Sequence, residues 1–334
     1  MKKKILLVGG CGFIGHNLAI YLKNNNYETH IIDSLGVNNI LSVMDNTVNN
    51  KNLYSSILNK RIELLQKNEI KLHIEDARDY HGLSKLFEII KPDKVIHLAA
   101  VSHANKSNKD PHNTFDHSLR TLENVLDNVR INKTHLIYLS SSMVYGNFEG
   151  NSVNENSICK PLGIYGTLKY AGELIIKSYN QVFGLPYTIV RPSALYGERC
   201  VSRRVGQVFI ENSLQDISIT VNGTGEEKLD FTYINDLVEG IRLICEKKES
   251  INETFNITYG QGRTVNDLIK ILKSHYPNQE INYQNKEAFS PERGTLDIGK
   301  AKKLLNYKSN YPIEKGYNLY IDWYKNFYSK LQKQ

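Results

Sequence analysis

Short apolar runs alternate with amphipathic stretches along the first half of the chain. Apolar runs bounded by turn residues predict buried strands, and apolar positions that recur every three or four residues predict helices. Strands that alternate with crossover helices form parallel sheets, so the fold class is α/β, with a Rossmann-type doubly wound parallel sheet. We expect strands at residues 5–8, 29–32, 70–74, 94–98, 135–139 and 187–190, and helices around 13–22, 83–90, 119–129 and 170–183.

Two segments depart from this alternation. An Asn-rich stretch at 37–68, with a predicted helix at 53–66, separates two strands that a minimal unit would join more briefly. A surface loop is the expectation for such an insertion, and a lid over a bound ligand is the alternative. The periodicity also loosens after Arg191. We therefore expect residues 1–192, with 230–258 returning to them, to form the first domain, and 193–229 with 259–334 to form a smaller C-terminal α/β lobe that binds the substrate.

The balance of charges suits several kinds of partner. The chain has 334 residues, and 42 Lys and Arg outnumber 35 Asp and Glu to give a net charge of +7. This excess fits a nucleic acid, a membrane surface or a phosphorylated small molecule. Basic residues are dispersed rather than clustered with aromatic stacking platforms, which disfavours nucleic acid, and no apolar run approaches the ~18 residues that a membrane span needs. The third kind of partner is therefore expected.

Cysteine usage predicts neither a metal site nor disulfide bonds. Cys11, Cys159, Cys200 and Cys245 lie far apart, without a Cys-x-x-Cys pair. We expect no metal and a reducing, cytoplasmic location.

Three glycines follow the first predicted strand and precede the first helix. Gly9, Gly12 and Gly15 suit a tight turn, the close approach of a pyrophosphate, and the packing of helix on strand, each of which excludes a Cβ. The helix N-terminus offers free N–H groups to phosphates. Asp33 ends the second strand, where its carboxylate would bind the adenosine ribose hydroxyls and repel a 2′-phosphate. The pattern predicts NAD rather than NADP.

Tyr165 and Lys169 stand four residues apart on a predicted helix, so they project from one face. A nearby ammonium favours the phenolate of a tyrosine, and such a pair could take a proton from an alcohol as hydride leaves its carbon. A solvated helix face is the default for this spacing alone. Ser140, Ser141 and Ser142 follow the fifth strand, at the edge of the sheet where ligands bind in such folds. The alternative for them is a simple turn.

These features occur in a fixed order with further strings. Residues 97–100 (His-Leu-Ala-Ala) follow the fourth strand, 141–146 (Ser-Ser-Met-Val-Tyr-Gly) follow the fifth, and 191–197 (Arg-Pro-Ser-Ala-Leu-Tyr-Gly) follow the Tyr165/Lys169 helix. As a set, they resemble the extended short-chain dehydrogenases/reductases, in particular the NAD-dependent nucleotide-sugar epimerase/dehydratase family. The resemblance continues through 230–236 and 293–298 and covers nearly the whole chain.

The resemblance implies a role for each matching position. Tyr165 would be the acid/base, Ser141 would hold the sugar hydroxyl, and Lys169 would bind the nicotinamide ribose and lower the pKa of the tyrosine. A buried, hydrogen-bonded structural role is expected for His97. The implied cofactor-binding residues are Gly9, Gly12, Phe13, Ile14, Gly15, Asp33, Asp76, Ala77, Leu98, Ala99, Ala100, Tyr165 and Lys169, and the expected substrate-binding residues are Ser102, His103, Ser141, Ser142, Arg204 and Arg293.

Departures from the family pattern reduce the number of reactions that the chain is expected to catalyse. Family dehydratases place Asp-Glu directly after the catalytic Ser or Thr, whereas Ser142 and Met143 stand here and neither can act as a general acid. Ala194 and Leu229 replace an Asn and an Arg that contact the nucleotide or diphosphate in many members. We therefore expect NAD-dependent oxidation at C4 of a nucleotide-diphosphate sugar, by a 4-dehydrogenase or 4-epimerase.

The finer expectations about the substrate and the oligomeric state rest on the resemblance to the family alone. The sugar is expected to be a GDP-linked heptose or deoxyhexose used for capsule or other surface polysaccharide, and the protein a homo-oligomer, either a dimer or a dimer of dimers. The alternatives are a nucleotide-sugar 4,6-dehydratase or 4-keto reductase, and, from another class, a non-catalytic NAD-binding sensor.

Overall fold

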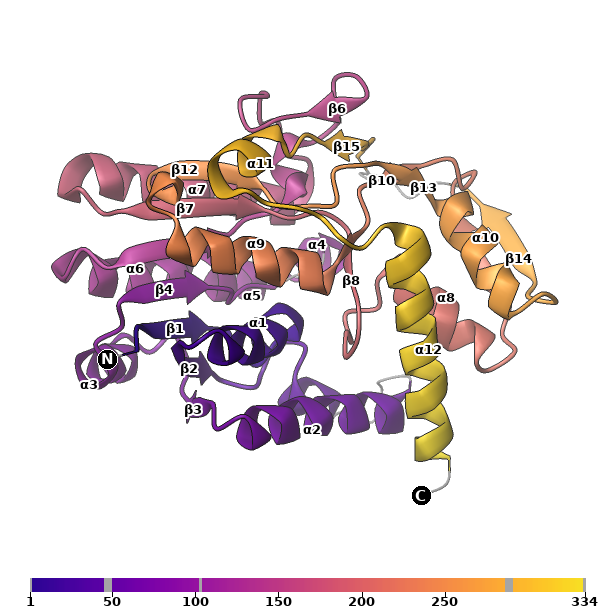
Figure 1. The fold of residues 1–334 in the computed structure, drawn as a ribbon, viewed down its shortest axis with the longest axis horizontal. Helices are drawn as coiled ribbons and strands as arrows, with labels where there is room; N and C mark the ends of the chain where they lie inside the picture. The colour runs from indigo at the N-terminus through magenta and orange to yellow at the C-terminus, as the bar shows by residue number, and fades with distance from the viewer. Residues whose placement is uncertain (1, 45–49, 102–103, 286–290, 333–334) are drawn as a thin grey trace.

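The computed structural model describes residues 2–44, 50–101, 104–285 and 291–332. Its centre is a parallel sheet of seven strands in the order β12-β7-β5-β4-β1-β2-β3 (Figure 1). The chain order reverses between β1 and β4, which is the switch point at which doubly wound sheets bind ligands. The strands are β1 (Lys4–Val8), β2 (Glu28–Asp33), β3 (Lys71–Ile74), β4 (Lys94–His97), β5 (His135–Leu139), β7 (Tyr187–Arg191) and β12 (Glu253–Asn256).

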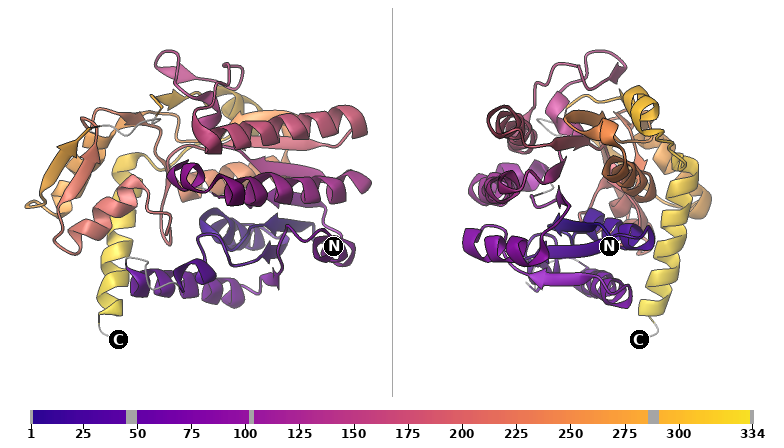
Figure 2. Two further views of the ribbon diagram at one scale, coloured as in Figure 1. Left: turned by 180° about the vertical axis from the view of Figure 1, so that it is seen from behind. Right: turned by 60° about the vertical axis from the view of Figure 1, so that its left-hand side comes forward.

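Helices cover both faces of this sheet (Figure 2). Alternate residues of each central strand enter two separate apolar cores, so that Leu7 packs on one side and Leu6 on the other. The first core includes side chains of α1 (Phe13–Asn24) and α9 (Ile234–Glu246), and the second includes those of α3 (Tyr80–Ile90), α6 (Thr121–Ile131) and α7 (Gly163–Phe183). The predicted α/β fold class, with its doubly wound parallel sheet, is confirmed.

The predicted strands lie within about two residues of the observed ones at each end. Within the segment 230–258, which was predicted to return to the first domain, β12 pairs in parallel with β7 at the sheet edge. The helix expected at 119–129 begins earlier than predicted, because a short π-helical turn, η2 (Asp116–Arg120), leads into α6.

The remaining elements form small sheets and helices beyond the C-terminal edge of the main sheet. Three helices dominate this part: α8 (Val205–Ser213), α10 (Val265–His275) and α12 (Ile313–Leu331). The strands pair as β6 (Ser152–Val153) with β15 (Thr295–Leu296), β8 (Leu195–Tyr196) with β11 (Thr232–Tyr233), β9 (Ile219–Asn222) with β14 (Ile281–Gln284), and β10 (Lys228–Leu229) with β13 (Arg263–Thr264).

Short helical segments complete the chain. The helix α11 (Gly299–Leu305) packs on β12 and α9, so part of the segment assigned to the lobe contacts the main sheet. The exact domain boundaries stay a prediction. The other short helices are η1 (Ile40–Val43), α4 (Ala104–Lys109), α5 (Pro111–Phe115), η3 (Ser142–Tyr145) and η4 (Lys248–Ser250).

The insertion at 37–68 contains the helix predicted at 53–66, but its described part is not the surface loop that was expected. It contains α2 (Lys51–Lys67), whose inner face is buried against α1, β3 and α12. Tyr54 on this face donates a hydrogen bond to the buried Glu211 of α8 over 2.7 Å. The expectation failed because the apolar residues of α2 find partners in segments that are remote in sequence.

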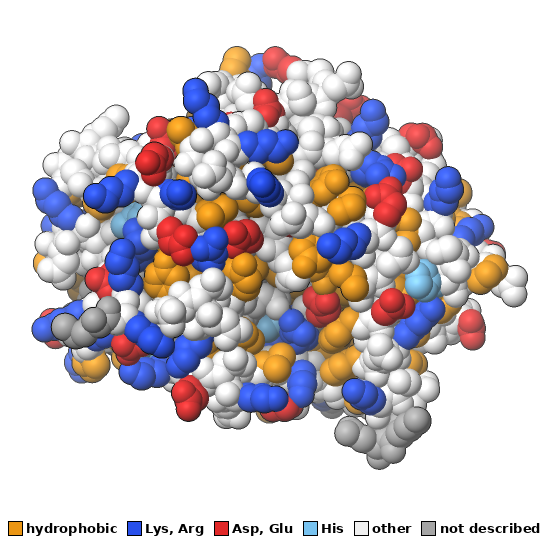
Figure 3. All heavy atoms as spheres, viewed as in Figure 1, with side chains coloured by type: hydrophobic (Ala, Val, Ile, Leu, Met, Phe, Trp, Pro, Cys, Tyr) orange, Lys and Arg blue, Asp and Glu red, His pale blue; other side chains and the backbone are white. Residues whose placement is uncertain are grey.

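The surface carries both charge signs without a large basic field on the face shown in Figure 3. Among the described residues, no helix combines the length and apolarity that crossing a membrane requires.

Candidate functional site

The three glycines after β1 have different surroundings. Gly9 has φ +79°, and a Cβ there would lie 2.6 Å from the backbone nitrogen of Ala99 on the neighbouring strand end. A Cβ on Gly15 would lie 2.4 Å from the carbonyl oxygen of Gly10. Among the described residues, a Cβ on Gly12 would meet nothing closer than the carbonyl oxygen of Gly9 at 3.5 Å, so this glycine leaves room for a ligand. The turn therefore has the form of a cradle for a ligand backbone such as a pyrophosphate.

Helix α1 begins directly behind this turn. Its N-cap is Gly12, which has no side chain with which to cap the first N–H groups. Free N–H groups and the positive end of the helix dipole attract anions.

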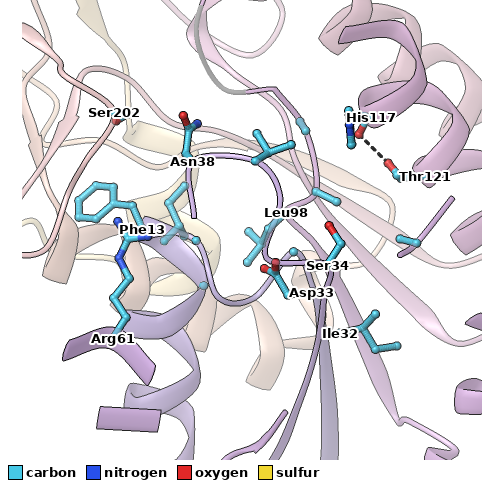
Figure 4. Close-up of a pocket in the computed structure, with 18 of the residues that line it drawn as sticks. Phe13, Ile32, Asp33, Ser34, Asn38, Arg61, Leu98, His117, Thr121 and Ser202 are labelled. Atoms are coloured by element: carbon cyan, nitrogen blue, oxygen red, sulfur yellow. Dashed lines mark hydrogen bonds between the residues drawn. The ribbon is translucent and has the colours of Figure 1, made fainter. Parts of the chain in front are cut away.

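A pocket opens in front of the glycine turn (Figure 4). It encloses about 980 Å³ of space not filled by protein atoms, part of which is open to solvent. The residues that line it include all the cofactor positions predicted between the first and fourth strands: Gly9, Gly12, Phe13, Ile14, Gly15, Asp33, Asp76, Ala77, Leu98, Ala99 and Ala100. These residues come from four different strand ends, so the sheet edge brings together positions far apart in sequence.

Two carboxylates lie at this pocket in different electrostatic states. Asp33 accepts hydrogen bonds from the backbone N–H groups of Cys11 and Leu35, both over 2.8 Å, while burial raises its pKa. Asp76 accepts hydrogen bonds from Arg78, the shortest over 2.7 Å, and these bonds hold its pKa below the usual range. The residues present fit a dinucleotide, with a carboxylate at the end of β2 for its ribose and a glycine cradle for its phosphates.

The predicted acid/base group lies outside the lining of this pocket. Tyr165 is in the first turn of α7 and is partly buried. Ser141, at the end of β5, lies close enough to act on the Tyr165 hydroxyl and to lower its pKa, so the structure brings the predicted Tyr and Ser together. Ser141 Oγ also accepts a hydrogen bond from the N–H of Met143 over 3.2 Å, which fixes its orientation.

Lys169 lies one helical turn after Tyr165 and is buried. Its ammonium donates to the carbonyl oxygen of Leu139 over 2.6 Å and sits 4.9 Å from the centre of the Tyr138 ring. Burial lowers its pKa to about 8. A lysine in this state keeps further N–H donors for a ligand at the end of β5.

The pKa of Tyr165 differs from the expectation. Burial raises it above its usual value, and the groups that oppose this rise are Arg204, through its charge, and Ser141, through its neighbouring hydroxyl. Lys169 is not among these groups. In the chain alone, the ammonium that was expected to favour the phenolate is instead bound to the carbonyl of Leu139.

Arg204 connects the two halves of the site. It forms the N-cap of α8 and lines the pocket, and its charge acts on both Tyr165 and Arg293. Burial and the charge of Arg204 lower the pKa of Arg293 to about 10. The Nε of Arg293 is buried and has no hydrogen-bond partner among the residues that the structure describes, so this side chain has a donor left for a ligand. Ser102 and His103, which were expected to bind the substrate, lie outside the described residues.

A buried ion pair supports the ends of β5 and β7. Glu173 of α7 and Arg191 of β7 are joined by Nη2 to Oε2 over 2.6 Å and by Nε to Oε1 over 3.0 Å, with side-chain exposures of 0% and 3%. Ser140 donates a further hydrogen bond to the carboxylate of Glu173. Ser140 precedes Ser141, and Glu173 follows Lys169 by one helical turn, so this network positions both neighbours.

His97 is buried, as expected, but it is not hydrogen-bonded. Neither ring nitrogen has a partner in the described chain, and the ring stacks on Tyr138 with centroids 6.0 Å apart. Burial lowers its pKa to about 3, so it is neutral. The expectation of a hydrogen-bonded histidine was wrong because β4 is covered here by an aromatic ring.

Several lining residues were not predicted. His117 and Thr121 face the pocket from η2 and α6, where the hydroxyl of Thr121 bonds to the carbonyl of His117 over 2.9 Å (Figure 4). Arg61 reaches the pocket from α2. A lone arginine within an amphipathic helix gives no sequence signal for such a position. The others are Ile32, Ser34, Val37, Asn38, Glu75, Leu195, Val201 and Ser202.

Comparisons with known proteins agree with this geometry. Residues 5–258 match the model of the NAD dependent epimerase/dehydratase family. A putative UDP-glucose 4-epimerase of Methanocaldococcus jannaschii is 31% identical over 96% of this chain and 98% of its own length. A dTDP-D-glucose 4,6-dehydratase of Dictyostelium discoideum is 31% identical over 76% of this chain and 58% of its own.

A solved structure extends the agreement to the whole fold. The UDP-glucuronic acid 4-epimerase from Bacillus cereus, in complex with UDP-glucuronic acid and NAD, has a TM-score of 0.86 at 28% identity and covers 97% of this chain and 100% of its own. With the glycine cradle, the pocket and these matches in agreement, the chain belongs to the NAD-dependent epimerase/dehydratase family of nucleotide-sugar enzymes, and NAD is its cofactor.

Proposed function

We propose that the protein is a nucleotide-sugar 4-epimerase, which oxidises and then reduces C4 of its substrate. The observation that carries this choice is the pair of residues after Ser141. Ser142 is buried and Met143 is apolar, so neither supplies the general acid that a dehydratase needs at this point. Ser141 and Tyr165, by contrast, lie next to each other and supply the two hydroxyls that proton transfer at a sugar hydroxyl needs.

The residues of the chain then act as follows. Ser141 holds the O4 hydroxyl, and Tyr165 takes its proton, directly or through Ser141. Lys169 would hold the ribose next to the nicotinamide when the cofactor is bound. Oxidation at C4 uses NAD as the hydride acceptor, which is the chemistry that the cofactor supplies when bound. Return of hydride to the other face of a rotated 4-keto sugar gives the epimer, and Tyr165 gives its proton back to O4.

Arg293 and Arg204 are proposed to bind the substrate diphosphate. A guanidinium forms a planar, always-charged fork that suits phosphate oxygens, and the buried Nε of Arg293 has no other partner within the described chain. The sequence suggested a GDP-linked heptose or deoxyhexose for surface polysaccharide. The relatives compared above carry the names of UDP- and dTDP-sugar enzymes, so we propose UDP-hexoses as the first substrates to test and retain the GDP-linked sugars in the same panel.

The experiment follows a deuterium label at C4 of each nucleotide sugar by mass spectrometry and NMR. An epimerase keeps the label in a product of unchanged mass, a dehydrogenase transfers it to released NADH, and a dehydratase product has lost water. Tyr165→Phe should abolish turnover while NAD binding persists. Tyr170→Phe, on the same helix, is the matched control and should turn over normally. Unchanged turnover by Tyr165→Phe would remove the assigned base, and no turnover of any sugar by the wild type would favour the NAD-binding sensor.

We also propose that the protein forms homodimers through α6 and α7. These helices lie side by side and carry apolar side chains that are exposed in the single chain, among them Val182, at 71%, and Leu174, at 48%. Apolar faces of this kind are commonly covered by a partner. Sedimentation at micromolar concentration should give a dimer, and a monomer would refute the proposal.

A further inference from the structure

The buried face of α2 contains one charged side chain among apolar ones. Its buried residues are Leu53, Tyr54, Ile57, Leu58, Arg61 and Leu65, and Arg61 is only 1% exposed. Arginine is seldom buried without a carboxylate partner, because taking its charge out of water is costly. The position of Arg61 therefore needs a specific reason.

Arg61 is held by backbone carbonyls rather than by an acid. Its Nε and Nη2 donate to the carbonyl oxygen of Arg199 over 3.0 and 2.5 Å, and its Nη1 lies 3.5 Å from the carbonyl oxygen of Cys11 in the glycine turn. Within residues 2–44, 50–101, 104–285 and 291–332, no carboxylate forms an ion pair with it. Burial lowers its pKa to about 10, so the group remains a cation at neutral pH.

A second guanidinium increases the positive charge at this place. Arg199 donates to Nε2 of His16 over 2.9 Å and to Oδ1 of Asn17 over 2.6 Å, and both acceptors belong to the first turns of α1. Burial holds the pKa of His16 well below its usual value, so this acceptor is neutral. The charge of Arg199 also lowers the pKa of Arg61. The chain thus places two cations close together on neutral partners.

Of these two cations, Arg61 lies where the glycine turn meets the pocket. Arg61 lines the pocket together with Gly12 and Phe13, and Figure 4 shows its guanidinium directed toward Phe13. The uncapped N-terminus of α1 adds positive potential at the same point. Asp33 is the acid that acts on Arg61, and its two oxygens already accept backbone N–H groups. A dianionic group in the pocket would balance this charge.

We propose that Arg61 binds the pyrophosphate of the dinucleotide, which makes the inserted helix α2 part of the cofactor site. The guanidinium has N–H groups beyond those that bond to the two carbonyls, and these would donate to phosphate oxygens. The far end of the same helix is fixed to the C-terminal lobe, because Tyr54 donates to Glu211 of α8. The glycine motif in the sequence does not predict this contribution, because α2 lies outside the motif.

The test compares two ligands that differ in phosphate. Protein freed of nucleotide is titrated calorimetrically with NAD⁺ and with adenosine, for the wild type, Arg61→Met and Lys60→Gln. Met fills a similar volume without charge, and Lys60→Gln removes one positive charge from the neighbouring position, which faces solvent and pairs with Glu63. Arg61→Met should weaken NAD⁺ binding about 10- to 100-fold, the range of a hydrogen bond to a charged group, and adenosine binding less than about twofold. Lys60→Gln should change neither.

Three results would overturn the proposal. The first is unchanged NAD⁺ affinity in Arg61→Met. The second is an equal loss of affinity for NAD⁺ and for adenosine in Arg61→Met, which indicates a structural role. The third is a loss of NAD⁺ affinity in Lys60→Gln that is as large as the loss in Arg61→Met. Arg61→Gln keeps a donor for the carbonyl of Arg199 and decides by the same comparison if Arg61→Met does not fold. Raising NaCl should weaken NAD⁺ binding more in the wild type than in either Arg61 variant.

Discussion

Removal of the carboxylate of Glu173 gives the most direct test of the network behind the site. Glu173→Ala leaves Arg191 buried with its Nε and Nη2 donors unpaired, and it removes the acceptor of the Ser140 hydroxyl. The pair is 0% and 3% exposed, so water cannot replace the lost partner without opening the fold. Breaking one side of a buried pair costs about 3–5 kcal/mol.

The structure places the expected loss in the lower part of that range. Arg191 keeps two other contacts, with the Tyr145 ring at 4.8 Å from its centre and with the carbonyl oxygen of Glu155 at 3.4 Å. We therefore expect Glu173→Ala to lower the free energy of unfolding by about 3–4 kcal/mol and the melting temperature by roughly 5–10 °C. Glu173→Leu combined with Arg191→Met removes both charges and should recover most of the loss, because no unpaired charge then remains.

The assay is urea unfolding followed by circular dichroism, with Glu253→Gln as the matched control. Glu253 pairs with Lys300 over 2.6 Å at the partly exposed edge of the sheet, so its loss should cost less than about 1 kcal/mol. A loss below about 1 kcal/mol for Glu173→Ala would show that the pair does not stabilise the fold. A double variant no more stable than Glu173→Ala would show that the unpaired charge is not the cause.

Three further predictions concern the cofactor turn, the base and a buried acid. Gly12→Ala should leave the stability of the cofactor-free protein nearly unchanged but weaken NAD⁺ binding, because its Cβ would enter the space for the ligand. Gly9→Ala should destabilise the fold itself, because Gly9 has a positive φ and its Cβ would clash with the backbone of Ala99. Thermal unfolding measures the stability of both variants, and calorimetry measures their affinity for NAD⁺. Arg204→Gln should move the pH profile of kcat/KM to higher pH, because the charge of Arg204 lowers the pKa of Tyr165. Burial raises the pKa of Asp230 from 3.8 to about 6, so the folded state binds this proton more tightly than the unfolded state and the associated stability is lost as pH rises through 6. Asp230→Asn should therefore gain stability relative to the wild type between pH 4 and 7.

Each of these predictions has a control and a contradicting outcome. For the turn, equal losses of stability in the two glycine variants would contradict the difference in their surroundings. For the base, Arg204→Lys keeps the charge and should restore the original profile, while an unshifted profile in Arg204→Gln would remove its electrostatic role. For the acid, a wild type that gains stability relative to Asp230→Asn as pH rises would reverse the sign of the assigned pKa shift.

The central sheet could be predicted from the sequence because each of its strands has a local sequence pattern. Each one is a short apolar run between turn residues, and the glycine string and Asp33 mark the strand ends where a ligand approaches. The positions between Gly9 and Ala100 therefore gathered at one pocket as expected. Sequence spacing fixes such positions because parallel strands end at a common edge.

The unpredicted parts depend on contacts between remote segments. Arg61 bonds to a carbonyl 138 residues away, and strands of two residues, such as β10 and β13, exist only because their partners hold them. The pKa of Tyr165 could not be predicted from the sequence either, because it depends on the charge of Arg204 at the start of a different helix. The spacing of Tyr165 and Lys169 shows that they share a helix face but not which carbonyl the ammonium binds.

The burial of α2 also bears on how the protein is made. Tyr54 of α2 and Tyr324 of α12 donate to opposite oxygens of the same carboxylate, Glu211, so the inner face of α2 is completed by a helix that lies some 270 residues further along the chain. At a translation rate of about 5–20 residues per second, α2 waits roughly 10 to 50 s for α12 to emerge. During that interval the apolar face of α2 is exposed on the nascent chain, together with Arg61, which is buried in the folded protein. Premature release before α12 should therefore yield a species that aggregates or recruits chaperones, even though the central sheet is already complete.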